Sequence, residues 1–112
     1  MKYYNMQLSY HIFKKKLESG KYELLDVRTL HEQTIYGVIS KNQLLIDIYS
    51  LDAIQQIQKL PKDKKYLIYC WHWSRSQYVV SIMKEMGIRE VYDLEGGIDV
   101  WNKNSLQIRE ST

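Results

Sequence analysis

Short apolar runs recur along the chain, separated by segments in which apolar residues are spaced differently. Runs of this kind are typical of strands buried within a sheet. Residues 22–27, 44–46 and 66–70 form the clearest runs, and residues 3–8 and 90–93 form weaker ones. The pattern therefore predicts four to five short strands.

Between these runs, apolar residues recur at intervals of three and four, which is the spacing of one face of a helix. This spacing predicts helices over residues 9–18, 51–60 and 75–86, a helical turn over 32–36, and a final helix that starts at residues 96–97. Ser9 is placed to cap the first helix, and Gly20, Pro61 and Gly87 each follow a predicted helix and end it. The side chains expected in the core are Ile12, Phe13 and Leu17, then Leu51, Ile54, Ile57 and Leu60, then Val79, Ile82, Met83 and Met86.

Strand and helix patterns alternate from one end of the chain to the other. Such an order implies helical crossovers, which join parallel strands and place helices over both faces of the sheet. We therefore expect an α/β fold with a central, mainly parallel sheet of four to five short strands and helices on both faces. The expected domain covers residues 1–104, and residues 105–112 are expected to form a C-terminal tail.

Composition places the chain among single-domain globular proteins. Its 112 residues, 45% of them hydrophobic, suit one domain, because two domains would each be too small for a good core. The net charge of +3 is mild, and the lysines at 14–16, 62 and 64–65 form short clusters that we interpret as solvated surface. With this mild charge and no basic stripe, we expect no nucleic-acid partner. No apolar stretch is long enough to cross a bilayer, so we expect no membrane partner.

Cys70 is the only cysteine, which excludes an intramolecular disulfide and fits a reducing compartment. The N-terminus also lacks the apolar core of a signal peptide, and together these features indicate a cytoplasmic protein. Cys70 stands at the carboxyl end of the run 66–70, and ligands of parallel sheets bind beyond the carboxyl ends of the strands. A free cysteine is most often a small buried hydrophobe, so its position alone leaves a purely structural role open.

The segment that follows Cys70 joins a predicted strand to a predicted helix and forms the candidate site. Unpaired amides and the helix dipole make a helix N-terminus positive, so such a loop can cradle an anion and favour a thiolate. Arg75 adds a fixed positive charge, and a thiolate beside such a cup suits attack on an anionic electrophile. The candidate substrate-binding loop consists of Trp71, His72, Trp73, Ser74, Arg75 and Ser76.

Three motifs, in order, resemble those of a single-domain rhodanese. The chain has Leu-Asp-Val-Arg with a later Glu in residues 25–32, a strand that ends in Cys70 before a short loop and a helix, and Leu-Glu-Gly-Gly-Ile with a later Trp in residues 94–101. Each motif is weak by itself, but three in the right order and spacing are specific. The resemblance covers roughly residues 9–103.

The resemblance implies a rhodanese-like fold and a sulfurtransferase activity with Cys70 as the catalytic nucleophile. In that family the cysteine carries sulfane sulfur as a persulfide. Asp26, Arg28 and Glu32 match the first motif and are expected to support the loop, with one of the carboxylates pairing with Arg75.

The implied reaction moves sulfur from thiosulfate or a persulfide to a thiophilic acceptor through Cys70. The slight positive charge favours a small anionic donor, and the acceptor is expected to be cyanide, a small thiol or a cysteine of a partner protein. No metal or organic cofactor is implied, since a single His-Cys pair makes a zinc site improbable. A monomer or weak homodimer is expected.

Two other functions remain open at this point. The family often has glycine where this chain has Trp73, and residues 37–42 differ from its usual loop, which suits an inactive rhodanese-like binding or regulatory module that docks a partner on Trp71 and Trp73. Cysteine-dependent phosphatases also hold an oxyanion in a loop before a helix. Four residues separate Cys70 from Arg75, one fewer than in those phosphatases, so the cup is smaller and better suited to a sulfane sulfur.

Overall fold

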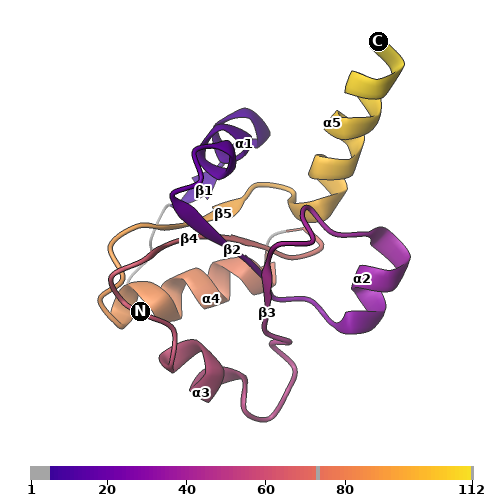
Figure 1. The fold of residues 1–112 in the computed structure, drawn as a ribbon. Helices are drawn as coiled ribbons and strands as arrows, with labels where there is room; N and C mark the ends of the chain where they lie inside the picture. The colour runs from indigo at the N-terminus through magenta and orange to yellow at the C-terminus, as the bar shows by residue number, and fades with distance from the viewer. Residues whose placement is uncertain (1–5, 73, 112) are drawn as a thin grey trace.

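The centre of the fold is a five-stranded sheet in which every strand pair is parallel. The computed structural model describes residues 6–72 and 74–111, with side chains up to residue 105 in the last helix. The strand order is β1-β5-β4-β2-β3, so β4 is central (Figure 1). The strands are β1 (Gln7–Leu8), β2 (Tyr22–Asp26), β3 (Leu44–Leu45), β4 (Lys65–Tyr69) and β5 (Val91–Leu94). The predicted α/β fold is confirmed.

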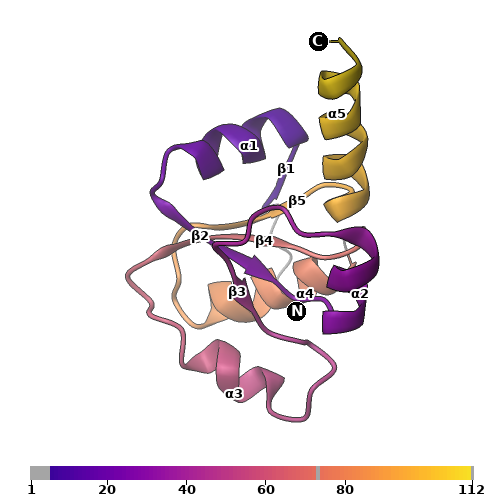
Figure 2. The ribbon, with the colours of Figure 1, turned by 45° about the vertical axis from the view of Figure 1, so that its right-hand side comes forward.

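Helices cover both faces of this sheet. Helices α1 (Tyr10–Glu18) and α5 (Gly97–Ser111) lie on one face, and α3 (Ala53–Gln58) and α4 (Ser74–Glu85) lie on the other, as Figures 1 and 2 show. Helix α2 (Leu30–Tyr36) follows β2 beyond the carboxyl end of that strand. Because the strands are parallel, the loops that follow β2, β4 and β5 all leave the sheet at the same edge.

Two apolar clusters, one on each face of the sheet, form the core. Successive side chains of a strand point to opposite faces, and β4 therefore contributes Ile68 to the cluster with α3 and α4, and Leu67 to the cluster with α1 and α5. Phe13 of α1 and Met83 of α4 are both 0% exposed. Complete burial of side chains of this size stabilises the fold by roughly 1.5–3 kcal/mol each.

In the helices predicted over residues 9–18 and 51–60, fewer apolar side chains are buried than the spacing predicts. Ile12 is 51% exposed and Leu51 is 103% exposed, although the helical spacing predicts both in the core. Ile12 adjoins Phe13, and neighbouring residues of a helix point about 100° apart, so only one of them faces the sheet. Leu51 precedes α3, which begins at Ala53 and is shorter than the predicted helix.

The two ends of the chain also differ from the prediction. The strand predicted at residues 3–8 is present at Gln7–Leu8, and residues 3–5 lie outside the described residues. Helix α5 continues to Ser111, through most of the segment expected as a tail, and its second half leaves the body of the domain in both views (Figures 1 and 2). No helix in the described part of the chain is long and apolar enough to cross a membrane.

Candidate active site

Cys70 lies directly after β4, the central strand, and its side chain is 1% exposed. The start of α5 holds the backbone there, because the Ile98 amide donates to the Cys70 carbonyl at 2.9 Å and the Asp99 amide donates to the Trp71 carbonyl at 3.4 Å. Gly97 has a φ of +59°, and a Cβ on it would overlap both carbonyl oxygens. The loop therefore depends on a close backbone approach that glycine alone permits.

The Cys70 sulfur lies against the first turn of α4. The Ser76 backbone amide donates to Sγ at 3.4 Å, and the thiol donates to Ser76 Oγ, also at 3.4 Å. Helix α4 begins at Ser74, so the Ser76 amide belongs to the first turn of the helix. The positive end of the helix dipole thus faces the sulfur.

Ser76 also connects Cys70 to a buried carboxylate, that of Asp93. Asp93 is not among the site residues predicted from the sequence. The Ser76 hydroxyl donates to Asp93 Oδ2 at 2.9 Å. Asp93 belongs to β5 and is buried, and loss of hydration of its charged form raises the pKa of its carboxyl to about 6. The available signal was an acidic residue inside the apolar segment Val91–Leu94, on the same strand face as Val91.

Arg75 forms a two-pronged ion pair with Glu32 of α2. Nη1 donates to Oε1 and Nη2 donates to Oε2, both at 2.6 Å. Glu32 also belongs to a capping box at the start of α2, where its Oε1 accepts from the Thr29 amide at 3.1 Å. The Arg75 guanidinium lowers the pKa of the Glu32 carboxyl to about 2. Glu32 is thus the predicted carboxylate that pairs with Arg75, and the pair ties the start of α4 to α2.

Asp26 and Arg28 form a separate ion pair that is completely buried. Arg28 Nε and Nη2 donate to the two carboxylate oxygens of Asp26 at 2.9 and 2.8 Å. Arg28 Nη2 also donates to the Gly37 carbonyl at 2.8 Å, and the guanidinium lies over the Tyr69 ring at 5.0 Å. This pair therefore fixes the chain after α2 against the central strands.

The remaining residues of the predicted loop differ in burial. The Trp71 ring is partly buried and packs on the Tyr36 ring, with centroids 4.0 Å apart. His72 and Ser74 are exposed, and Ser74 begins α4. Trp73 lies outside the described residues. Trp71 therefore packs against its own domain.

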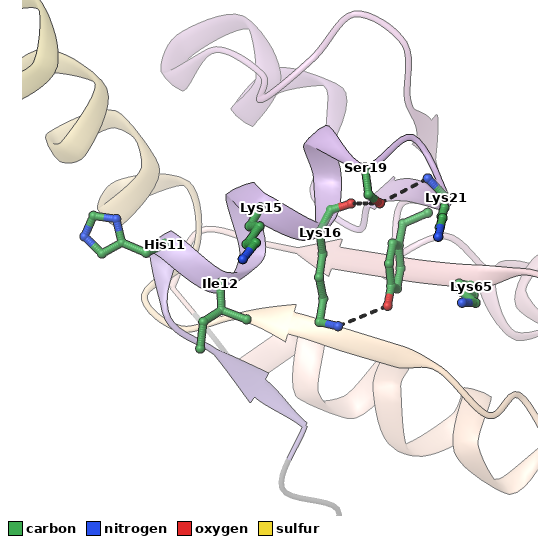
Figure 3. A pocket seen from close by; sticks show the side chains of 8 residues that line it. His11, Ile12, Lys15, Lys16, Ser19, Lys21 and Lys65 are labelled. Carbon is green, nitrogen blue, oxygen red and sulfur yellow. Dashed lines mark hydrogen bonds between the residues drawn. The ribbon is translucent and has the colours of Figure 1, made fainter.

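A cavity of about 600 Å³ lies beside the amino ends of β2 and β4, at the edge of the sheet opposite Cys70 (Figure 3). Lys15, Lys16, Lys21 and Lys65 contribute to its lining, and Lys16 Nζ donates to the Tyr22 hydroxyl at 3.2 Å. No thiol or carboxylate lines it. Among the residues that the structure describes, no three His, Cys, Asp or Glu side chains are grouped to hold a metal ion.

Comparison with known proteins identifies relatives of this chain and of its fold. A family model described as the rhodanese-like domain matches residues 9–104. A 44-residue segment is 43% identical to thiosulfate sulfurtransferase GlpE of Coxiella burnetii, and it covers 39% of this chain and 41% of that protein. Over 95 residues the chain is 26% identical to GlpE of Vibrio cholerae, with 85% of this chain and 86% of that protein covered. The crystal structure of a rhodanese-related protein from Thermoplasma volcanium superposes with a TM-score of 0.68 at 25% identity, over 88% of this chain and 91% of that one.

Proposed function

The chain belongs to the rhodanese-like family, and we propose that it is a sulfurtransferase in which Cys70 carries sulfane sulfur as a persulfide. The observation that carries the proposal is the position of the Cys70 sulfur. It accepts a hydrogen bond from the Ser76 amide, in the first turn of α4, at 3.4 Å. That position favours a thiolate and can bind an anion. The similarity to proteins named thiosulfate sulfurtransferase supports the same class of reaction.

The proposed reaction has two covalent steps. In the first, the Cys70 thiolate attacks the outer sulfur of thiosulfate or of a small persulfide. A bond forms between the two sulfurs, the S–S bond of the donor breaks, and its electron pair leaves with sulfite or a thiolate. In the second step, a thiophilic acceptor attacks the terminal sulfur and Cys70 leaves as a thiolate. Two such steps predict ping-pong kinetics.

Backbone amides rather than the arginine are expected to stabilise the anions in this cycle. Because Glu32 neutralises Arg75 through contacts of 2.6 Å, the guanidinium contributes little net charge to the loop. The start of α4 retains its positive end, and the Ser76 amide already points at Sγ. The donor's anionic group and the persulfide would both occupy this field.

A phosphatase activity is disfavoured by the same arginine. A phosphatase of this loop type would need its arginine to hold phosphate oxygens through parallel hydrogen bonds. Here Glu32 occupies both terminal nitrogens of Arg75. The four residues between Cys70 and Arg75 also make a small cup.

The alternative that remains is an inactive binding or regulatory module docking a partner on Trp71 and Trp73. The packing of Trp71 on Tyr36, with centroids 4.0 Å apart, gives that tryptophan a role within the domain. This contact favours the enzyme over a pair of tryptophans kept free for docking.

The proposed donor is a small anion, and the proposed acceptor is a small thiol, cyanide or a cysteine of a partner protein. Neither step needs a metal or an organic cofactor. We propose a cytoplasmic setting, because a reducing compartment keeps a single reactive thiol free. The proposed state is a monomer or a weak homodimer.

Intact-mass spectrometry tests the proposal directly. Incubation with thiosulfate, and separately with glutathione persulfide, is expected to add one sulfur to the wild type, and cyanide is expected to remove it. Cys70→Ser and the iodoacetamide-treated wild type are matched controls, because Cys70 is the only cysteine. A wild type that gains no cyanolysable sulfur from either donor contradicts the proposal. A phosphate-ester assay on the same sample tests the phosphatase.

A further inference from the structure

The contacts of Cys70 lead inward through Ser76 to Asp93, and we propose that Asp93 holds the proton that Cys70 loses when its thiolate forms. The inference rests on the proposed function of Cys70 as a nucleophile, which it deepens. Asp93 acts through Ser76 and is therefore a positioning residue, with no contact to the substrate.

The three side chains form a continuous hydrogen-bonded series from three elements. The Cys70 thiol donates to Ser76 Oγ at 3.4 Å, and the Ser76 hydroxyl donates to Asp93 Oδ2 at 2.9 Å. The larger radius of sulfur accounts for the longer of the two contacts. In the parallel pairing of β4 with β5, Ile68 lies opposite Asp93, which places the carboxylate beneath the loop. All three side chains are buried, so a proton that leaves Sγ inward follows this series.

The surroundings of Asp93 suit a group that gains and loses a proton near neutral pH. Asp93 faces Gln7 of β1 and Ser76 of α4, and their hydrogen bonds favour its ionised form. Burial opposes ionisation and is the largest effect, and the negative charge of Glu95 after β5 acts in the same direction, so the pKa of Asp93 is raised to about 6. Asp93 is thus a carboxylate at neutral pH that accepts a proton more readily than an exposed aspartate does.

Transfer along the series conserves both charge and protons. In the resting state Cys70 is a thiol and Asp93 is a carboxylate. To form the thiolate, the S–H bond breaks as a bond forms from that proton to Ser76 Oγ, and the original hydroxyl proton passes to Asp93 Oδ2. Asp93 is then a neutral acid, and the Ser76 hydroxyl donates to the thiolate. No base from solution and no other reactant is required.

Sulfur transfer uses this exchange in both directions. During loading, the thiolate attacks the donor and receives no proton back, so Asp93, whose pKa of about 6 lies below neutral pH, returns its proton to solvent. During discharge, Cys70 leaves as a thiolate and regains a proton through Ser76.

The test is the pH dependence of Cys70 alkylation by iodoacetamide, from about pH 5 to about pH 10. Two coupled groups lose their protons in two macroscopic steps. We expect the wild-type rate to rise in two steps, the lower near the pH at which Asp93 ionises. In Asp93→Asn the lower step is expected to vanish, and the single remaining step is expected to lie about one pH unit or more below the upper step of the wild type, which is about a tenfold difference in rate at a fixed pH between them.

A second variant and a control complete the experiment. Ser76→Ala removes the hydroxyl that hydrogen-bonds both groups while leaving Asp93 ionisable, and it is expected to reduce the height of the lower step, because the thiolate beside a neutral Asp93 loses that hydrogen bond. Asp63→Asn, at an exposed aspartate near the opposite edge of the sheet, is expected to keep both steps. A substitution that only disturbed packing would scale the rate without removing a step.

Three results would overturn the inference: a lower step that survives in Asp93→Asn, a lower step of unchanged height in Ser76→Ala, or a wild-type profile with a single step. Alkylation requires no sulfur donor, so this outcome is independent of whether thiosulfate loads Cys70. A protein that loads sulfur but shows a single-step profile keeps its proposed function and loses the role of Asp93. A protein that shows a two-step profile but loads no sulfur keeps the role of Asp93 and loses its proposed function.

Discussion

Arg75 and Glu32 face each other with Nη1 and Nη2 of the guanidinium each 2.6 Å from a different carboxylate oxygen. Their side chains are 18% and 20% exposed, so water screens the pair only in part. Parallel bonds of this kind fix orientation as well as distance. The pair therefore connects α4, whose first turn holds the Cys70 sulfur, to α2.

Glu32→Gln is expected to slow sulfur loading by about tenfold or more, because the first turn of α4 loses its fixed position. The free energy of unfolding should fall by about 1–2 kcal/mol, between the values typical of exposed and buried pairs. Single-turnover loading followed by mass spectrometry, together with urea unfolding, measures both effects. Glu18→Gln, at the exposed end of α1, is the control and should change neither. Normal loading by Glu32→Gln would show that the pair does not position the loop.

The contribution of Glu32 to stability should disappear in acid. Its folded-state pKa is lowered from 4.5 to about 2, so the ionised form is the one that the fold stabilises. The contribution is present in full above pH 4.5 and is lost as pH falls through about 2. The difference in unfolding free energy between the wild type and Glu32→Gln should therefore shrink as pH is lowered over this range. A difference that stays constant would argue against the ion pair as its source.

Asp93→Asn is expected to stabilise the fold above pH 6 by about 1–3 kcal/mol. The folded-state pKa of Asp93 is raised from 3.8 to about 6, so its contribution to stability is present below pH 3.8 and is lost as pH rises through about 6. The amide of asparagine carries no charge and avoids that loss. Thermal unfolding at pH 8 should show a higher Tm for the variant, and at pH 3.5 the two proteins should differ little. A lower Tm at pH 8 would mean that the hydrogen bonds of Asp93 outweigh its burial.

Gly97→Ala is expected to reduce sulfur loading severely and to destabilise the protein, because the new Cβ would overlap the carbonyl oxygens of Cys70 and Trp71. Gly20→Ala is a matched control, since Gly20 also has a positive φ, of +74°, but a Cβ there meets nothing within 4 Å. The control bears only the cost of the backbone conformation, about 1 kcal/mol. Loading assays and unfolding curves on both variants separate the two effects. Equal behaviour of the pair would remove the close approach as the reason for Gly97.

Asp26→Asn is expected to lower the free energy of unfolding by about 3–5 kcal/mol, because it leaves Arg28 charged, buried and without its counter-ion. Glu23→Gln breaks the pair of Glu23 with Lys64, whose side chains are 43% and 52% exposed, and should cost less than about 1 kcal/mol. Chemical denaturation of both variants makes the comparison. Similar losses in the two would contradict the distinction between the buried pair and the surface pair.

The parts of the fold that could be predicted are those with a strong local pattern. The run that ends at Cys70 is a buried central strand, and Gly87 and Pro61 do follow helices, because these signals act through neighbouring residues. Ser9 stands at the N-cap of α1, although its side chain makes no capping hydrogen bond. The exposure of individual side chains was predicted less well. A helix buries only the residues that the sheet or another helix covers, and Ile12 of α1 lies outside the covered face.

The site was predictable where chemistry follows the chain and not where it depends on strand order. Cys70, Arg75 and Ser76 lie within one short segment, so their proximity was visible in the sequence. Asp93 reaches Ser76 because β5 pairs with β4, and the pairing of distant strands leaves no local signal. The choice of Glu32 over Asp26 as the partner of Arg75 likewise depends on where α2 packs after β2.

Completion of the site during synthesis follows from the hydrogen bond of the Ile98 amide to the Cys70 carbonyl. Synthesis runs from the N-terminus, so Cys70 leaves the ribosome before residue 98 does, and the loop emerges without the helix start that anchors it. Strand β1 is separated from its partner in the sheet, β5, by an even longer stretch of chain. Contacts between such distant segments slow folding. The environment of the Cys70 thiol is therefore completed only when the start of α5 packs against the loop.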